Sequence, residues 1–208
     1  MYQYLPSFVL GFHGCDREVG EAVLAGEPLK ASTNDYDWLG QGIYFWENSP
    51  ERALSYAESI KRYKKRGKGA IKHPYVIGAV LDLGLCFNLT EEGALLELQG
   101  AFALLEATTG ATGNPLPINK PGFEGDLDLL KRHLDCAVFQ NMHAARTKFD
   151  LPSYETVRSP FNEGGGLYPG TSFREKTHIQ ICVREVSCIK GYFRPLSDDG
   201  SLFQTNDQ

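Results

Sequence analysis

The stretch Leu39-Gly40-Gln41-Gly42-Ile43-Tyr44-Phe45 carries the strongest signal in this chain. Its two glycines predict a bend that enters a short apolar strand, Ile43 to Trp46, made of β-branched and aromatic residues. A helix start follows, because Ser49 suits the N-cap position and Pro50 suits the first helical position. We therefore expect a strand–turn–helix unit here, with the helix running from Pro50 to about Lys65.

The predicted strand and the predicted helix each carry a tyrosine. Tyr56 follows Tyr44 by twelve positions, so the two elements are expected to present both phenol rings to one pocket. Two aromatic faces can hold a flat cationic ring between them. The alternative is that both tyrosines are ordinary core residues, and Tyr56 taken alone fits either interpretation.

A second signal lies upstream, where the apolar run Phe8 to Phe12 is followed by His13-Gly14. The run predicts a buried strand that His13-Gly14 closes. A glycine there lets a ligand approach the backbone closely. A neutral imidazole both donates and accepts a hydrogen bond, which suits it to holding a sugar hydroxyl. A satisfied histidine beside a turn is the alternative.

A third segment begins at Thr177, from which polar and apolar residues alternate with period two. This pattern predicts a half-buried strand, with His178 and Gln180 on one face and the isoleucines on the other. The polar pair fits a ligand cleft, and a solvated sheet face explains it equally well.

Taken in chain order, with the His13-Gly14 segment first, the three segments resemble the three strand motifs of the ADP-ribosyltransferases, in the branch related to poly(ADP-ribose) polymerases and diphtheria toxin. The resemblance implies an α+β fold, a split two-sheet sandwich with flanking helices, as a single domain over residues 1–208. It implies that NAD+ binds in the cleft between the sheets. In the family pattern, His13 holds the nicotinamide ribose, the Gly14 backbone reads the carboxamide, and Tyr44 and Tyr56 stack on the nicotinamide.

This sequence departs from the family pattern in two places. The spacing from Tyr44 to Tyr56 is one residue longer than in poly(ADP-ribose) polymerases, and Arg52 and Ala53 stand near the place of a serine that contacts the carboxamide. In the third motif the family usually has glutamate, whereas Gln180 is the match here. Two glutamates are further candidates for the third catalytic residue: Glu175 first and Glu163, in the preceding loop, second.

The activity that the resemblance implies is NAD-dependent ADP-ribosyl transfer. Such an enzyme cleaves the nicotinamide–ribose bond through an oxocarbenium-like transition state and transfers ADP-ribose to a macromolecule. An NAD glycohydrolase and a non-catalytic module that binds NAD or ADP-ribose are the alternatives. By analogy, a small transferase of this kind suits a bacterial toxin or a phage-defence effector, which an antitoxin partner would restrain.

A cluster of basic residues points to the acceptor. The formal net charge of −5 argues against broad nucleic-acid binding. Against this background, a dense basic run follows the predicted Tyr56 helix: Lys61, Arg62, Lys64, Lys65, Arg66, Lys68 and Lys72. Such a run supplies the electrostatic part of RNA or DNA binding, so we expect a nucleic-acid acceptor, RNA first. The alternative is that the run only forms a solvated surface, and a protein remains a possible acceptor.

Composition sets the broad class. A chain of 208 residues with 42% hydrophobic residues is long enough for one sizeable core. No apolar run approaches the roughly 18 residues of a membrane span, and the first residues lack the features of a signal peptide. The five cysteines are scattered and suggest neither a disulfide framework nor a zinc site. We therefore expect a cytoplasmic protein with no membrane contact and no metal.

The remaining segments are predicted from local patterns. Thr90 to Thr108 reads as a helix capped by Thr90, and Asp126 to about His143 as a second helix. Two further strands are expected at His73 to Leu83 and Cys188 to Pro195. The glycine-rich stretch Ser159 to Arg174 is predicted to be a loop that selects the substrate.

Overall fold

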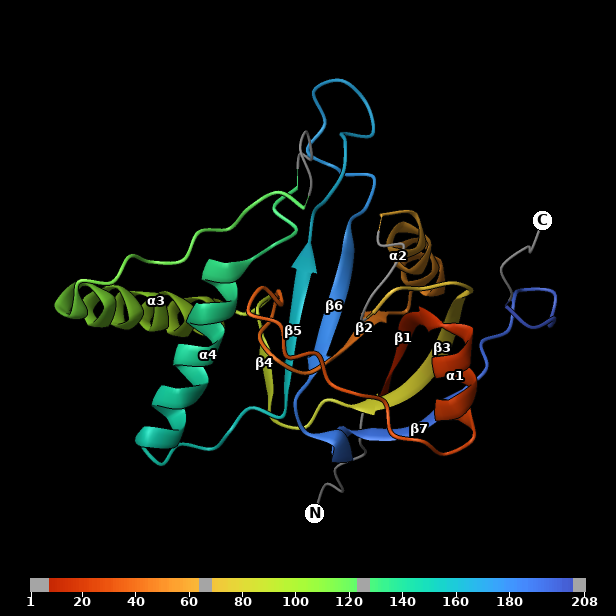
Figure 1. Ribbon diagram of the computed structural model, residues 1–208, viewed down its shortest axis with the longest axis horizontal. Helices are drawn as coiled ribbons and strands as arrows, with labels where there is room; N and C mark the ends of the chain where they lie inside the picture. The colour runs from red at the N-terminus through yellow and green to blue at the C-terminus, as the bar shows by residue number, and fades with distance from the viewer. Residues whose placement is uncertain (1–7, 64–68, 123–127, 204–208) are drawn as a thin grey trace, which may run out of the picture. The chain divides into compact units, whose positions relative to one another are not determined.

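The computed structural model describes residues 8–63, 69–122 and 128–203. The chain groups into two compact units. The first unit comprises Met1–Lys30, Tyr44–Leu83 and Val186–Gln208, and the second comprises Ala31–Ile43 and Gly84–Glu185. Helices and strands occur in both units (Figure 1), which confirms the α+β class. None of the helices in the described ranges combines the length and apolar character that a bilayer crossing requires.

The strands of the first unit pair in the order β2-β1-β3-β7. Each neighbouring pair is antiparallel. Their bounds are β1 (Phe8–Asp16), β2 (Ile43–Glu47), β3 (Pro74–Asp82) and β7 (Ile189–Phe193), the last preceded by a 3-10 turn, η1 (Val186–Cys188). The helices of this unit are α1 (Arg17–Leu24) and α2 (Pro50–Tyr63).

The two helices of the first unit pack on opposite faces of its strands. Helix α2 lies against the face that carries Phe12, where Ala53 is fully buried. A Cβ at Gly14 would lie 2.1 Å from the Ala53 carbonyl oxygen, so only glycine permits this close approach. Helix α1 covers the other face, where Gly20 packs directly on the Tyr75 ring.

In the second unit, β5 (Thr156–Phe161) lies between β4 (Cys86–Asn88) and β6 (His178–Val183). It pairs parallel with β4 and antiparallel with β6. Helices α3 (Glu92–Thr112) and α4 (His133–Lys148) contact each other (Figure 1). Helix α4 is well anchored, with Phe139 and Met142 in the core, whereas α3 buries Ala101 alone among its residues.

The glycine bend predicted before β2 belongs to the second unit and is confirmed. Gly40 has a φ of +81°, a conformation that favours glycine. Gly42 packs so closely on β6 that a Cβ would lie 2.5 Å from Cys182 Sγ. Backbone conformation at Gly40 and close packing at Gly42 therefore explain why glycine stands at both positions.

Several predicted boundaries are wrong. The His13-Gly14 pair lies inside β1, which continues to Asp16, and not at its end. Helix α3 begins after Glu91, so Thr90 is not its cap. The helix predicted from Asp126 begins only at His133, because the Asn119 side chain accepts hydrogen bonds from Leu134 N and Asp135 N.

The loop predicted from Ser159 is also partly wrong, because β5 extends to Phe161. In the sequence, Pro160 argues against a strand here, since proline cannot donate a ladder hydrogen bond. The pairing of β5 with β4 ends at Arg158, so Pro160 lies where β6 is the only partner along this ladder. The short elements α1 and β4 were not predicted.

Candidate functional site

The first motif lies where β1 and β2 separate. The pairing of β1 with β3 runs from Phe8 to Asp16, whereas its pairing with β2 covers only Gly11 and Phe12, opposite Glu47 and Trp46. The ladder between β1 and β2 thus stops directly before His13-Gly14.

This geometry gives the Gly14 backbone a particular role. Asn48 N donates to Leu10 O, so the even-numbered residues of β1 point their N–H and C=O groups towards β2. In an antiparallel strand this direction alternates from residue to residue. The N–H and C=O of Gly14 therefore point to the β2 side, beyond the end of that ladder. An amide in this place can bond both groups.

His13 connects the two separating strands through its side chain. Its Nδ1 lies 2.8 Å from the Tyr44 carbonyl oxygen. Because a carbonyl only accepts, Nδ1 carries the proton and Nε2 of the neutral ring is left as an acceptor. Burial lowers the pKa of His13, an effect that the bond to Tyr44 partly offsets, so the neutral ring is favoured.

The aromatic residues of the second motif lie on the α2 side of the strands. Phe12 stands opposite Trp46, so alternation places Tyr44 on the same face as Trp46, and His13 on the other face with Phe45. The Tyr56 ring packs on Trp46, with the ring centroids 4.9 Å apart. Sequence reasoning missed Trp46, although it stands two residues after Tyr44 on the same face.

Gln180 lies in the second unit, on β6, opposite Ser159 of β5. It is buried, and its side-chain amide makes no hydrogen bond to any of the described residues. His178 is buried on the same strand face, and its Nδ1 lies 2.7 Å from the Lys176 carbonyl oxygen. The solvated sheet face considered for this pair is therefore wrong.

The two candidate glutamates differ sharply in environment. The Glu163 side chain is only 4% exposed, and its Oε2 lies 3.7 Å from His178 Nδ1. Glu175 is exposed and accepts a hydrogen bond from Gly165 N, which ties together the loop between β5 and β6. Of the two, Glu163 alone joins the buried polar group with His178 and Gln180.

The structure thus forms two groups of predicted residues, each within one unit. The first unit holds His13, Gly14, Tyr44 and Tyr56 around the end of the β1–β2 ladder. The second unit holds Gln180 and His178 on β6, with the loop residue Glu163 beside His178.

The basic run is described only at its ends. Lys61 and Arg62 lie exposed in the last turn of α2, and Lys72 is exposed before β3. Lys64, Lys65, Arg66 and Lys68 lie outside the described residues. In the ranges that are described, no cluster of three or more histidine, cysteine or acidic residues has the arrangement of a metal site.

Comparison with known proteins finds a similar archaeal protein. The chain is 22% identical over 196 residues to an uncharacterized protein of Methanocaldococcus jannaschii, a match that spans 86% of this chain and 83% of that protein. No family model matches the chain. No solved structure matches it either. The function must therefore be inferred from the geometry of the site.

Proposed function

We propose that this protein is an ADP-ribosyltransferase that cleaves NAD+ at the nicotinamide–ribose bond and passes ADP-ribose to a macromolecule. One observation carries the proposal. The β1–β2 ladder ends immediately before His13-Gly14, and His13 bonds the Tyr44 carbonyl across the opening. The two residues that the motifs single out, 31 positions apart, are thereby in direct contact.

The Gly14 backbone supplies the recognition of nicotinamide in this proposal. A primary carboxamide has one acceptor and two donor hydrogens, which complement an N–H and a C=O on the same strand edge. Tyr44, together with Tyr56, which packs on the buried Trp46, supplies aromatic faces for the cationic ring. Nicotinamide binding would then be shared between backbone and stacking.

The ribose is held by groups that accept or donate single hydrogen bonds. His13 Nε2 accepts a hydrogen bond from a ribose hydroxyl, and the family resemblance assigns the bond to the 2′-hydroxyl to Gln180. As the C–N bond breaks, its electron pair leaves with nicotinamide and positive charge develops on the ribose. A neutral amide stabilises that charge less than a carboxylate does, so we assign the charge stabilisation to Glu163. The nucleophile of the acceptor then forms a bond to the ribose carbon that nicotinamide has left, and it releases its proton.

The finer features of the proposal follow the family resemblance. They are the split two-sheet sandwich as one domain over 1–208, a cytoplasmic location, and a role as a toxin or phage-defence effector with an antitoxin partner. RNA is the proposed acceptor, on the grounds of the basic run that begins at Lys61.

Incubation with NAD+ labelled in the adenylate phosphate, together with total cellular RNA and protein, tests the proposal. Label on an acceptor supports transfer, release of free ADP-ribose alone supports an NAD glycohydrolase, and turnover of neither kind supports a binding module. Tyr44→Ala should lose roughly 1–3 kcal/mol of NAD+ binding. Tyr168→Ala is the matched control, because Tyr168 is an exposed tyrosine on a loop of the second unit. Equal NAD+ affinity of the two variants would refute the proposed pocket.

A further inference from the structure

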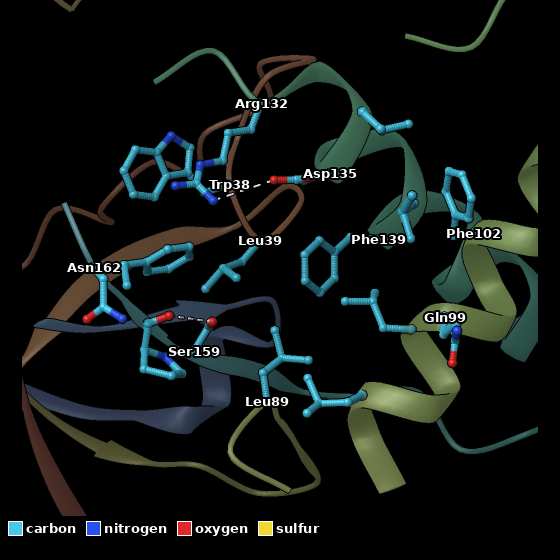
Figure 2. A pocket seen from close by; sticks show the side chains of 16 residues that line it. Trp38, Leu39, Leu89, Gln99, Phe102, Arg132, Asp135, Phe139, Ser159 and Asn162 are labelled. Atoms are coloured by element: carbon cyan, nitrogen blue, oxygen red, sulfur yellow. Dashed lines mark hydrogen bonds and ion pairs between the residues drawn. The ribbon is translucent and has the colours of Figure 1, made fainter. Parts of the chain in front are cut away.

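A cavity of about 650 Å³ lies within the second unit, and none of the residues assigned to the proposed NAD+ site lines it (Figure 2). Its walls come from α3, α4, β5 and the segment 31–43. Pockets that bind small molecules commonly have volumes of about 300–1,000 Å³. The cavity is therefore of a size that suits a ligand.

Most of the residues that line the cavity are apolar. Leucine and aromatic side chains from α3 and α4 face those of Leu39 and Leu89 across the cavity, as Figure 2 shows for Phe102 and Phe139. Leu95, also in the wall, is half exposed, at 51%. Such apolar surface, left partly open to water, favours an apolar ligand body.

One end of the cavity carries a preorganised cation. The guanidinium of Arg132 lies over the Trp38 ring at 4.0 Å and over the Phe161 ring at 4.9 Å. Trp38 is itself fixed by a hydrogen bond from Nε1 to the Leu130 carbonyl oxygen. The aromatic rings hold the guanidinium in place, and Figure 2 shows it paired with Asp135, which also lines the cavity.

The described residues leave part of the hydrogen-bonding capacity of Arg132 unused. Its Nε is buried and has no hydrogen-bond partner among the described residues. Its ion pair with Asp135 is long, at 3.5 Å. Buried donors are normally satisfied, and the planar fork of arginine matches the two oxygens of a carboxylate or phosphate.

We propose that this cavity binds a small amphipathic acid, whose apolar body packs against α3 and α4 and whose carboxylate or phosphate bonds Arg132. The site is independent of the proposed transferase activity. A fatty acid and an alkyl phosphate share this chemistry, and the two can be distinguished by experiment.

Asp135 provides a test of the charge of the ligand. Its Oδ1 is bonded by Asn119 Nδ2 at 2.8 Å, and its Oδ2 faces Arg132. This carboxylate repels an anionic ligand and competes for Arg132. Asp135→Asn therefore tightens the binding of an acid, whereas it would weaken the binding of a cation.

Isothermal titration of the full chain with decanoate, decyl phosphate and decanol tests the proposal. One or both acids should bind with one-to-one stoichiometry and at least about tenfold more tightly than decanol, because a charge-assisted hydrogen bond is worth about that factor. The tighter of the two acids identifies the preferred head group. Equal affinity for decanol and both acids, or no binding of either acid, would overturn the proposal without any mutation.

Variants locate the head group. Arg132→Met should weaken the acids at least about tenfold and leave decanol unchanged, since methionine keeps the apolar stem. Asp135→Asn should tighten the acids severalfold. Lys131→Met is the matched control, because this neighbouring lysine is exposed and does not line the cavity. Weaker binding in Asp135→Asn, or an equal effect of Lys131→Met and Arg132→Met, would contradict the assignment.

Discussion

His13 Nδ1 donates a hydrogen bond of 2.8 Å to the Tyr44 carbonyl oxygen, and this bond joins two strands at the point where their backbone pairing ends. A side chain therefore replaces the missing ladder bond. The same bond selects the tautomer of His13 and leaves Nε2 as an acceptor. One contact thus fixes both the local backbone geometry and the chemistry of the ring.

The two nitrogens of His13 can be tested separately. In His13→Asn the shorter amide can still donate to the Tyr44 carbonyl but offers nothing at the position of Nε2. We expect NAD+ turnover to fall about tenfold, the upper end of the value of one hydrogen bond, while the melting temperature changes little. Steady-state rates and thermal unfolding measure the two effects. Unchanged turnover would show that Nε2 does not contact the substrate.

Gly14 should prove essential for stability as well as for recognition. In Gly14→Ala the new methyl group would lie 2.1 Å from the Ala53 carbonyl oxygen, a backbone atom of α2. Helix α2 would have to move, which should cost about 1–3 kcal/mol of unfolding free energy, the usual range for overpacking.

Gly100→Ala is the matched control for that substitution. A Cβ at Gly100, inside α3, meets nothing within 4 Å. This variant should gain about 0.5–1 kcal/mol, because alanine favours a helix interior over glycine. Urea denaturation measures both variants, and equal stabilities would contradict the packing of α2 on β1.

Local signals explain what the sequence could predict. The bend at Gly40, strand β2 and the start of α2 at Pro50 each depend on residues within a few positions of one another. For these elements, turn chemistry, capping preference and apolar pattern agree. The same holds for β6, whose alternation starts one residue before the observed strand.

Features that depend on distant residues could not be predicted. The start of α4 depends on Asn119, which lies 15 positions before Leu134. The end of the β1–β2 ladder and the stacking of Tyr56 on Trp46 arise from how the strands diverge and how α2 packs. Likewise, the pattern around Gln180 contains nothing that marks Glu163 as the carboxylate beside His178, because a loop brings it there.

The two glutamates make a direct comparison for the third catalytic residue. Glu163→Gln should reduce turnover at least about tenfold, because it removes a buried charge near the developing positive charge. Glu175→Gln should have a smaller effect, since the exposed Glu175 carboxylate bonds the backbone of Gly165. Single-turnover rates measure the effects, with circular dichroism to confirm folding. A larger loss from Glu175→Gln would reverse the assignment.

The basic run is expected to bind the acceptor and not NAD+. Replacing Lys64, Lys65 and Arg66 by glutamate should abolish transfer to RNA while NAD+ affinity stays unchanged. Transfer by the natural protein should also weaken steeply with salt, with log affinity falling by about 0.7 per phosphate contact to a single strand for each decade of salt. Filter assays of labelled RNA measure both effects.

The control for this reversal replaces three exposed lysines elsewhere in the chain, Lys30, Lys120 and Lys131, by glutamate. It changes the net charge by the same amount without altering the run. If both triple variants lose transfer equally, the effect is one of overall charge. If neither loses it, the run is a solvated face and a protein side chain becomes the better acceptor.

Acid sensitivity is expected to come from His143 of α4. This side chain is buried, and neither ring nitrogen has a hydrogen-bond partner in the described part of the chain. Burial, reinforced by the charges of Arg184 and Arg146, lowers the pKa of His143 to about 3. Folding therefore holds this ring in its neutral form well below the pH at which an exposed histidine is protonated.

The sign of the effect on stability follows from proton binding. An unfolded histidine has a pKa of about 6.5, so between that pH and about 3 the unfolded chain binds a proton that the folded chain does not. The contribution of His143 is complete above pH 6.5 and declines by about 1.4 kcal/mol for each pH unit below it.

His143→Leu should remove this slope, and Met142→Leu, a neighbouring buried change without a titrating group, should keep it. Urea unfolding at pH 7 and pH 5 should then show the natural protein losing about 2 kcal/mol more than His143→Leu. Parallel losses in the two proteins would mean that His143 becomes protonated without unfolding the helix around it.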